Sequence, residues 1–240
     1  MASADFASPD RTARTGSPYA IDHVFMLVEP GGAETMAKLA KGGLTQSWSR
    51  KHVGMGTANI FVCFDNAFLE LVWIENEAEA LSGPVGKRLV ERNNKRNIGA
   101  MPYGLAIRAP SMDHVMPFEG WRFTPPSVSD MKNTVMIANS SDDPAQPFLF
   151  RSQRSVPPKE WTDELAGKRQ VPGGFGSITS WRLDLPKGVA PGKDLQKLQE
   201  LGLLTLGETS GPTAAWTVTA SRLDGGEPRR FRLPDCTWED

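Results

Sequence analysis

The stretch AIDHVFMLV at residues 20–28 carries the strongest structural signal in the chain. It is apolar and rich in β-branched residues, and a Pro-Gly-Gly turn follows it, which is typical of a buried strand. Residues 33–41 then place apolar side chains at helical spacing, and Gly42-Gly43 marks the end of a predicted helix. Three more strands, the last two joined by a tight turn, are predicted at residues 44–50, 57–64 and 67–74. The predicted order over residues 20–75 is therefore β-α-β-β-β.

The same order of elements recurs further along the chain. Residues 100–152 predict a second copy, and residues 177–240 predict a third, weaker copy as an additional C-terminal half. Each copy of such a repeat is expected to bury its sheet face against another. The remaining segments are interpreted as a disordered tail at 1–18, a basic and partly helical stretch at 81–97 and a linker loop at 154–176.

The composition excludes several classes of protein. The chain has 240 residues and a formal net charge of −1, which argues against a dedicated nucleic-acid binder. The longest apolar stretches are too short to span a bilayer, so no membrane partner is expected. The first residues lack the apolar core of a secretory signal, and two distant cysteines make no disulfide framework. A cytoplasmic location and a small-molecule partner are therefore the expectation.

Three motifs together resemble the vicinal oxygen chelate superfamily, which includes glyoxalase I, extradiol dioxygenases and bleomycin-binding proteins. They are Ile21-Asp22-His23-Val24, the stretch HVGMGTAN at 52–59, and Phe68-Leu69-Glu70-Leu71-Val72. The resemblance implies an α+β fold in which two βαβββ units, 20–75 and 100–152, form one glyoxalase-like domain at 19–153. In that fold the units build a cupped mixed sheet with helices on the outside. The resemblance also implies a divalent metal ion (Zn, Fe, Mn, Ni or Co) in the cup.

The family pattern points to His23 and Glu70 as metal ligands, with Glu70 also in a catalytic role. Imidazole and carboxylate groups suit these metals, and a catalytic site keeps positions open for water or substrate. Each residue has a plainer interpretation. His23 could be a satisfied histidine on a sheet face, and Glu70 could point to water, because strands alternate their faces.

The second copy departs from the family pattern. Its first strand offers Tyr103 or Gly104 where a ligand usually stands, and its last strand offers Arg151 in place of a Glu. We expect Tyr103 to contact the substrate. We expect Arg151 to hold an anionic group of the substrate, since a guanidinium grips carboxylates in bidentate fashion. The alternative for Arg151 is an exposed strand end.

The glycine turn between His52 and Asn59 is the remaining candidate. His52 could act as an acid–base group near neutral pH, and Asn59 could hydrogen-bond a substrate carbonyl. The alternative is a turn that needs glycine, with His52 solvated.

These residues lead to a metal-dependent lyase, isomerase or dioxygenase acting on a small oxygen-rich metabolite. In this hypothesis the metal polarises a substrate oxygen as a Lewis acid. The alternative is a non-catalytic drug-binding protein of the same fold, or a scaffold whose cup is filled by its own side chains. An odd number of copies also suggests a possible homodimer.

Overall fold

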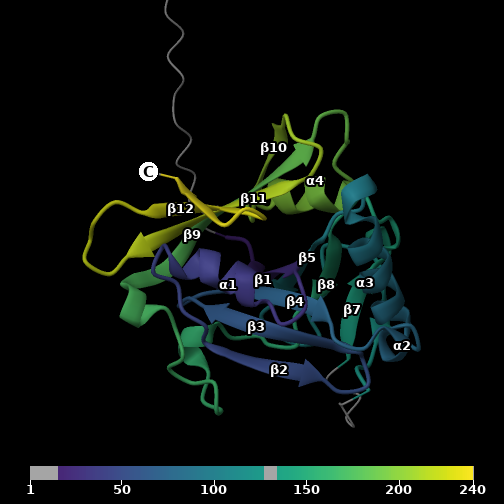
Figure 1. Ribbon diagram of the computed structural model, residues 1–240, viewed down its shortest axis with the longest axis horizontal. Coiled ribbons are helices and arrows are strands. Elements are labelled where there is room, and N and C mark those ends of the chain that lie inside the picture. Colours follow the sequence, from purple (N-terminus) through teal and green to yellow (C-terminus); the bar gives the residue numbers. More distant parts are fainter. Residues whose placement is uncertain (1–15, 127–133, 240) are drawn as a thin grey trace, which may run out of the picture.

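The computed structural model describes residues 16–126 and 134–239, and it consists of two β-sheets with helices between and beside them (Figure 1). Residues 1–15 of the expected N-terminal tail lie outside this description. The helices are α1 (Ala33–Ala40), α2 (Glu77–Ala80), α3 (Pro84–Lys95) and α4 (Lys193–Glu200). The larger sheet holds β1 (Ala20–Leu27), β2 (Trp48–His52), β3 (Thr57–Cys63), β4 (Phe68–Ile74), β5 (Tyr103–Arg108), β6 (Gly120–Phe123), β7 (Val135–Ala138) and β8 (Phe148–Arg151). The smaller sheet holds β9 (Phe175–Pro186), β10 (Thr205–Thr209), β11 (Ala215–Arg222), β12 (Arg229–Leu233) and β13 (Thr237–Glu239).

The larger sheet has two related halves that meet along β1 and β5. Its strand order is β2-β3-β4-β1-β5-β8-β7-β6. β1 and β5 are antiparallel, while β1 pairs in parallel with β4 and β5 pairs in parallel with β8. The α+β class and the mixed sheet are thus confirmed. The second half lacks the helix of the first: the residues that follow β5 form a turn, closed by a hydrogen bond from the His114 amide to the Ser111 carbonyl.

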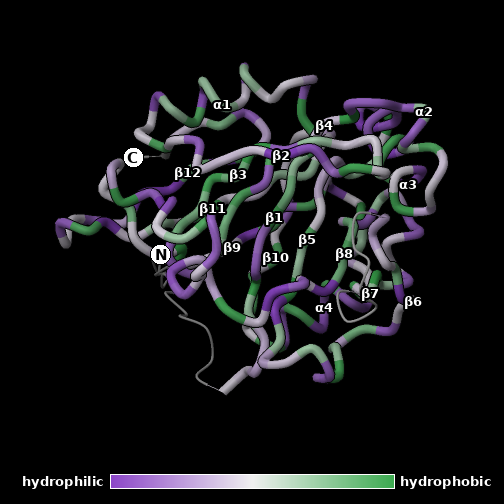
Figure 2. The backbone as a smooth tube through the Cα atoms, turned by 90° about the horizontal axis from the view of Figure 1, so that it is seen from below, coloured by the Kyte–Doolittle hydropathy of each residue, from purple (hydrophilic) through white to green (hydrophobic). Residues whose placement is uncertain are grey.

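Alternating side chains give the larger sheet two faces with different roles. On the face that we call the back face, Val24, Leu71 and Leu105 join a core that includes Trp216 and Val218 of the smaller sheet. In Figure 1 the smaller sheet (green to yellow) covers this side, with α1 between the two sheets. The opposite face, which we call the pocket face, carries the side chains at the alternate strand positions, and α3 packs against it. The central strands β4, β5 and β8 carry more apolar residues than the outlying α2 (Figure 2).

The smaller sheet has the element order of a third unit but not its strand pairing. In the first unit, β1 lies beside β4, the last strand of that unit. The order of the smaller sheet is β10-β9-β11-β12-β13. Its first strand, β9, therefore lies between β10 and β11 and is not a neighbour of β12, the strand that corresponds to β4. The C-terminal residues therefore form a different arrangement that covers the back face, and they do not build a third half-cup.

The segment expected as a linker, 154–176, packs against the larger sheet. Its Trp161 and Leu165 form a cluster with Phe61, Cys63 and Phe68 of β3 and β4. The residues 154–165 thus form one wall of the pocket described below.

The basic stretch around α3 also contains one buried cation. Arg92 is 1% exposed and donates hydrogen bonds to the carbonyl groups of five residues. Those residues are Met101, Ser141, Asp143, Pro144 and Gln146. A guanidinium can be buried at this position because carbonyl groups of the neighbouring backbone replace water at both of its Nη atoms.

Candidate functional site

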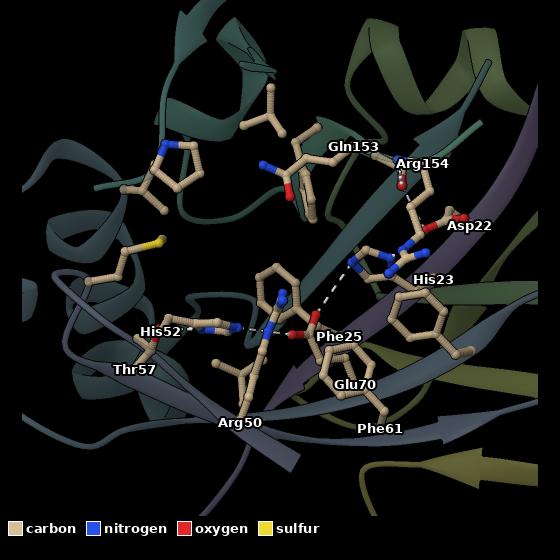
Figure 3. Close-up of a pocket in the computed structure, with 18 of the residues that line it drawn as sticks. Asp22, His23, Phe25, Arg50, His52, Thr57, Phe61, Glu70, Gln153 and Arg154 are labelled. Carbon is tan, nitrogen blue, oxygen red and sulfur yellow. Dashed lines mark hydrogen bonds and ion pairs between the residues drawn. The ribbon is translucent and has the colours of Figure 1, made fainter. Parts of the chain in front are cut away.

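The pocket face holds one cavity of about 260 Å³, between the two halves of the larger sheet (Figure 3). Apolar and aromatic side chains make up most of its lining, with Val85 and Leu89 contributed by α3. Most of the polar side chains belong to the first unit, and Ser152, Gln153 and Arg154 add polar groups from the residues that follow β8. Such a pocket, mostly apolar with a few convergent polar groups, is the usual form of a small-molecule site.

The polar end is a row of four side chains from four strands of the first unit. Glu70 on β4 stands at the centre, and His23 on β1 and His52 on β2 approach it from two sides (Figure 3). The His23 Nε2 atom lies 3.3 Å from Glu70 Oε2, and the His52 Nε2 atom lies 3.8 Å from Glu70 Oε1. The fourth member is Asn59 on β3, whose side-chain amide donates to Glu70 Oε1. The structure therefore brings together three of the predicted residues with Glu70 itself.

A β-bulge in β1 explains how His23 is held. The pairing of β1 with β5 shifts between Ile21 and His23, so that Asp22 is the extra residue of the strand. A bulge re-aims a side chain that strict alternation would send to the other face. As a result, Asp22 Oδ2 lies 2.9 Å from the Nδ1 atom of the adjacent His23. The His23 ring also stacks on Phe68, with ring centroids 4.2 Å apart.

Asp22 is itself fully enclosed by donors. Arg108 Nη1 donates to Asp22 Oδ1 at 2.7 Å, and the Ser152 hydroxyl donates to Asp22 Oδ2 at 2.8 Å. Burial raises the pKa of Asp22, but the hydrogen bond and charge of His23, together with Arg108 and Ser152, outweigh it and hold that pKa below its ordinary value. The carboxylate thus stays ionised beside His23.

The histidine on β2 is held in the opposite way, by neutral groups. His52 Nδ1 lies 2.8 Å from Thr57 Oγ1, and the Asn59 amide nitrogen lies 3.1 Å from His52 Nε2. Because the Asn59 amide donates, His52 Nε2 must accept and cannot carry a proton. Burial is the largest cause that lowers the pKa of His52; Glu70 opposes it and Arg50 adds to it. The ring is therefore neutral, not the solvated histidine of the plainer interpretation.

Asn59 lies beneath the pocket rather than in its lining. It is 0% exposed, and its amide group contacts Glu70 and His52 at once. The expectation that Asn59 binds a substrate carbonyl is thereby corrected: its place suits a residue that orients two site residues.

Tyr103 and Arg151 fall on the back face, away from the pocket. Tyr103 belongs to the core shared with the smaller sheet, and burial raises its pKa. Arg151 is 4% exposed and donates to the Ser111 carbonyl and to Met112 Sδ. Neither lines the cavity, so the expected substrate contacts of both residues are corrected. Neighbouring side chains of a strand point to opposite faces of the sheet. A predicted position that is wrong by one residue therefore lies on the wrong face.

The pairing of β1 with β5 identifies the true counterparts of His23 and Glu70. Val24 pairs with Leu105, and a two-fold axis through this pair relates His23 to Gly104 and Phe25 to Ala106. Glu70 lies beside Phe25, and Phe150 lies beside Ala106, so Phe150 matches Glu70. A Cβ atom at Gly104 would stand 1.8 Å from Phe25 Cε1, which leaves no space for a ligating side chain there.

The residues do not supply a complete ligand set for the divalent metal that the fold implies. His23 and Glu70 are two donors, and their counterparts are a glycine and a phenylalanine. The His52 Nε2 lone pair is already engaged by the amide of Asn59. Across the described ranges, no three His, Cys, Asp or Glu side chains stand together so that they could hold a metal ion.

Two residues of the site were not among the expected ones. Asp22 acts through the bulge, which has no signal in the sequence. Arg50 lines the pocket, and the alternation of Trp48, Arg50 and His52 along β2 could have indicated it, since these three share one face of the strand.

Comparison with known proteins agrees with the fold. Residues 21–171 match the family described as "Glyoxalase-like domain", and the chain therefore belongs to this family. The resemblance to the vicinal oxygen chelate superfamily is thereby confirmed, and members of that superfamily bind small-molecule substrates. None of the curated proteins matches the chain.

The solved structures that are similar to this chain include the following two. One is methylmalonyl-CoA epimerase from Mycobacterium tuberculosis, with a TM-score of 0.39 and 14% identity, covering 57% of this chain and 89% of the other. The other is a hypothetical protein from Staphylococcus aureus, with a TM-score of 0.45 and 12% identity, covering 88% of this chain and 85% of the other. Such weak likenesses say nothing about the reaction. Within residues 16–126 and 134–239, no helix is both long and apolar enough to cross a bilayer.

Proposed function

We propose that this protein is an isomerase- or lyase-type enzyme that moves a proton at a carbon atom next to a carbonyl group of a small substrate. The observation that carries the proposal is the position of Glu70, a carboxylate with 9% exposed side chain between two histidines, at 3.3 and 3.8 Å. A buried carboxylate among aromatic rings is costly unless it is paired. Pairs of titratable groups in different environments are the usual sign of acid–base chemistry.

Glu70 is the general base in this proposal. Asn59 holds its Oε1 atom, while its Oε2 atom faces His23. The carboxylate is thereby kept in one orientation, which general-base catalysis requires, because the base must lie within hydrogen-bond reach of the proton it takes.

His23 is the general acid. Its Nδ1 and Nε2 atoms each face a carboxylate oxygen, of Asp22 and of Glu70. His23 can therefore return a proton through Nε2, while Asp22 keeps the ring oriented.

His52 contributes no proton of its own, because its Nδ1 hydrogen is bound to Thr57 and its Nε2 atom accepts from Asn59. Its neutral ring stabilises the orientation of the Asn59 amide, which in turn holds Glu70. His52 is thus a positioning residue, and we expect its substitution to weaken turnover less than that of Glu70.

Solvent hydrogen exchange tests the proposal without knowledge of the natural substrate. The protein is incubated in D₂O with a panel of small ketones, aldehydes, and 2-oxo and 2-hydroxy acids, and loss of the C–H signal is followed by NMR. We expect exchange of at least one compound in the wild-type protein and at least a hundredfold slower exchange in Glu70→Gln, in line with the usual contribution of a general base, about 10²–10⁴-fold. Glu34→Gln on α1, whose side chain is 70% exposed, is the matched control.

Two outcomes would contradict the proposal. Compounds that bind but never exchange, in any variant, would favour the non-catalytic binding protein instead. Exchange that persists unchanged in Glu70→Gln would remove Glu70 from the mechanism.

The metal-dependent form expected from the sequence would have only His23 and Glu70 as protein donors, which is an incomplete ligand set, so no step of this proposal involves a metal. Metal analysis of protein purified without chelator tests this. A Zn²⁺- or Ni²⁺-dependent rise in melting temperature that disappears in His23→Ala would contradict it.

A further inference from the structure

Arg50 is a cation at the pocket without an acidic partner. It belongs to β2, lines the cavity and extends toward the same part of the pocket as His52 and Glu70 (Figure 3). Its guanidinium carbon lies 5.5 Å from the ring centroids of both Trp48 and Phe61. Its side chain is exposed and, among the described residues, forms no ion pair or hydrogen bond. The aromatic rings thus fix the guanidinium through its face and leave its N–H groups unused.

The other charged groups of the lining are already paired. Asp22 is bound to Arg108, Lys51 to Glu75, and Arg154 to Asp163. Glu70 faces the two histidines. Arg50 is therefore the one lining cation, within the described residues, whose charge no carboxylate compensates.

The opposite wall of the pocket is apolar. Phe148 and Phe150 of β8, Val135 and Ile137 of β7, and Leu89 of α3 form it. In this half of the sheet Gly104 and Phe150 stand in place of polar residues, and the polar lining residue beside this wall is Gln153, which follows β8 (Figure 3). A molecule with one polar end and an apolar body therefore matches the lining of the cavity.

We propose that the substrate is a carboxylate with an apolar body, whose carboxylate binds Arg50 while the body lies against the wall formed by β7 and β8. This inference rests on the proposed function, because it places the reacting carbon between Arg50 and the apolar wall, beside Glu70. One uncompensated guanidinium matches one negative charge, and its fork of N–H groups matches a carboxylate in bidentate fashion. A phosphate, with close to two charges at pH 7, would face additional repulsion from Glu70.

Binding of matched probes tests the inference separately from turnover. The probes are 3-phenylpropanoate, 3-phenylpropan-1-ol and 3-phenylpropyl phosphate, which share one apolar body, and dissociation constants are measured by calorimetry or NMR titration. We expect the acid to bind the wild-type protein at least tenfold more tightly than the alcohol, and more tightly than the phosphate. In Arg50→Gln the acid should lose this advantage, while Arg50→Lys should keep part of it.

Two further variants make the outcome decisive. Arg230→Gln on the exposed side of β12 removes a distant arginine and should change nothing. Glu70→Gln should bind the acid at least as tightly as the wild type, since it removes a neighbouring negative charge. Binding of the acid by this variant therefore tests the role of Arg50 separately from the proposed role of Glu70 as the base. An acid that binds no better than the alcohol, an acid preference that survives Arg50→Gln, or no binding by any probe would overturn the inference. Tighter binding of the phosphate would overturn the choice of a carboxylate.

Discussion

Replacing Asp22 by Asn should destabilise the protein strongly, although the two side chains have the same size. Asp22 is 1% exposed and accepts from His23 Nδ1 at 2.9 Å, Arg108 Nη1 at 2.7 Å and Ser152 Oγ at 2.8 Å. An amide has one acceptor oxygen, and its NH₂ group would face at least one of these donors. The substitution also leaves the Arg108 guanidinium, with 10% exposed side chain, without its counter-charge.

The expected cost follows from that unpaired charge. Removing one partner of a buried ion pair costs about 3–5 kcal/mol of unfolding free energy. A typical domain has a total of about 5–15 kcal/mol, so the variant should unfold at a much lower urea concentration. The double variant Asp22→Asn/Arg108→Met should recover part of the loss, because it removes the uncompensated charge and keeps a long apolar side chain. Glu34→Gln, an exposed position, should leave the urea midpoint unchanged.

The pH dependence has a defined sign. The pKa of Asp22 is lower in the folded protein than in the unfolded chain, where an Asp titrates near about 3.9. Its contribution to stability is therefore complete above that value and is lost as the pH falls through the folded pKa. Asp22→Asn should remove this part of the acid destabilisation, so its stability should depend less on pH at the acid end.

The assay is urea unfolding followed by circular dichroism at a series of pH values. Nitrogen NMR of the rings adds a local readout, because the chain has only 3 histidines and the variant changes the hydrogen-bond partner of His23 Nδ1. A loss below about 1 kcal/mol, the size of an average substitution, would refute the argument. So would a double variant that is less stable than Asp22→Asn alone.

Three further predictions concern other positions. The neutral ring of His52, whose pKa is lowered chiefly by burial, should stay unprotonated in NMR titrations at a pH just below about 6.5, where a free histidine side chain is already protonated. Because the unfolded chain then binds more protons, stability should fall as the pH drops through this value. Arg92→Met removes the donor to five carbonyl groups. It should lower the free energy of unfolding in urea by more than about 3 kcal/mol, because each hydrogen bond to a charged group contributes about 1.5–3 kcal/mol. A smaller loss would mean that water replaces the guanidinium. Gly104→Ala places a methyl group against the Phe25 ring and should lower the free energy of unfolding by about 1–3 kcal/mol through overpacking. If the Phe25 ring fills the position of the missing ligand, the added substitution Phe25→Leu should restore stability.

The local pattern of the chain was enough to predict the first unit, and the family resemblance added its central pair of residues. The order β-α-β-β-β follows from short periodic segments separated by glycine and proline, which act within a few residues. His23 and Glu70 could be predicted to meet because the family resemblance supplied the pairing of β1 with β4. Burial of a carboxylate between leucines on β4 was also a reliable sign, since its cost demands a partner.

Only the tertiary structure decided which side chains face the pocket. Strand side chains alternate with a period of two, so an uncertainty of one residue moved Tyr103 and Arg151 from the pocket face to the back face. A bulge at Asp22, set by the pairing of β1 with β5, placed two consecutive side chains on one side, and no local pattern announces it. The pairing of the C-terminal strands is likewise a long-range property, so a sequence that reads as a third copy folds into a sheet that covers the back face. The anion-binding role first expected of Arg151 passes, in our proposal, to Arg50, because strand register and not residue type decides which arginine lines the cavity.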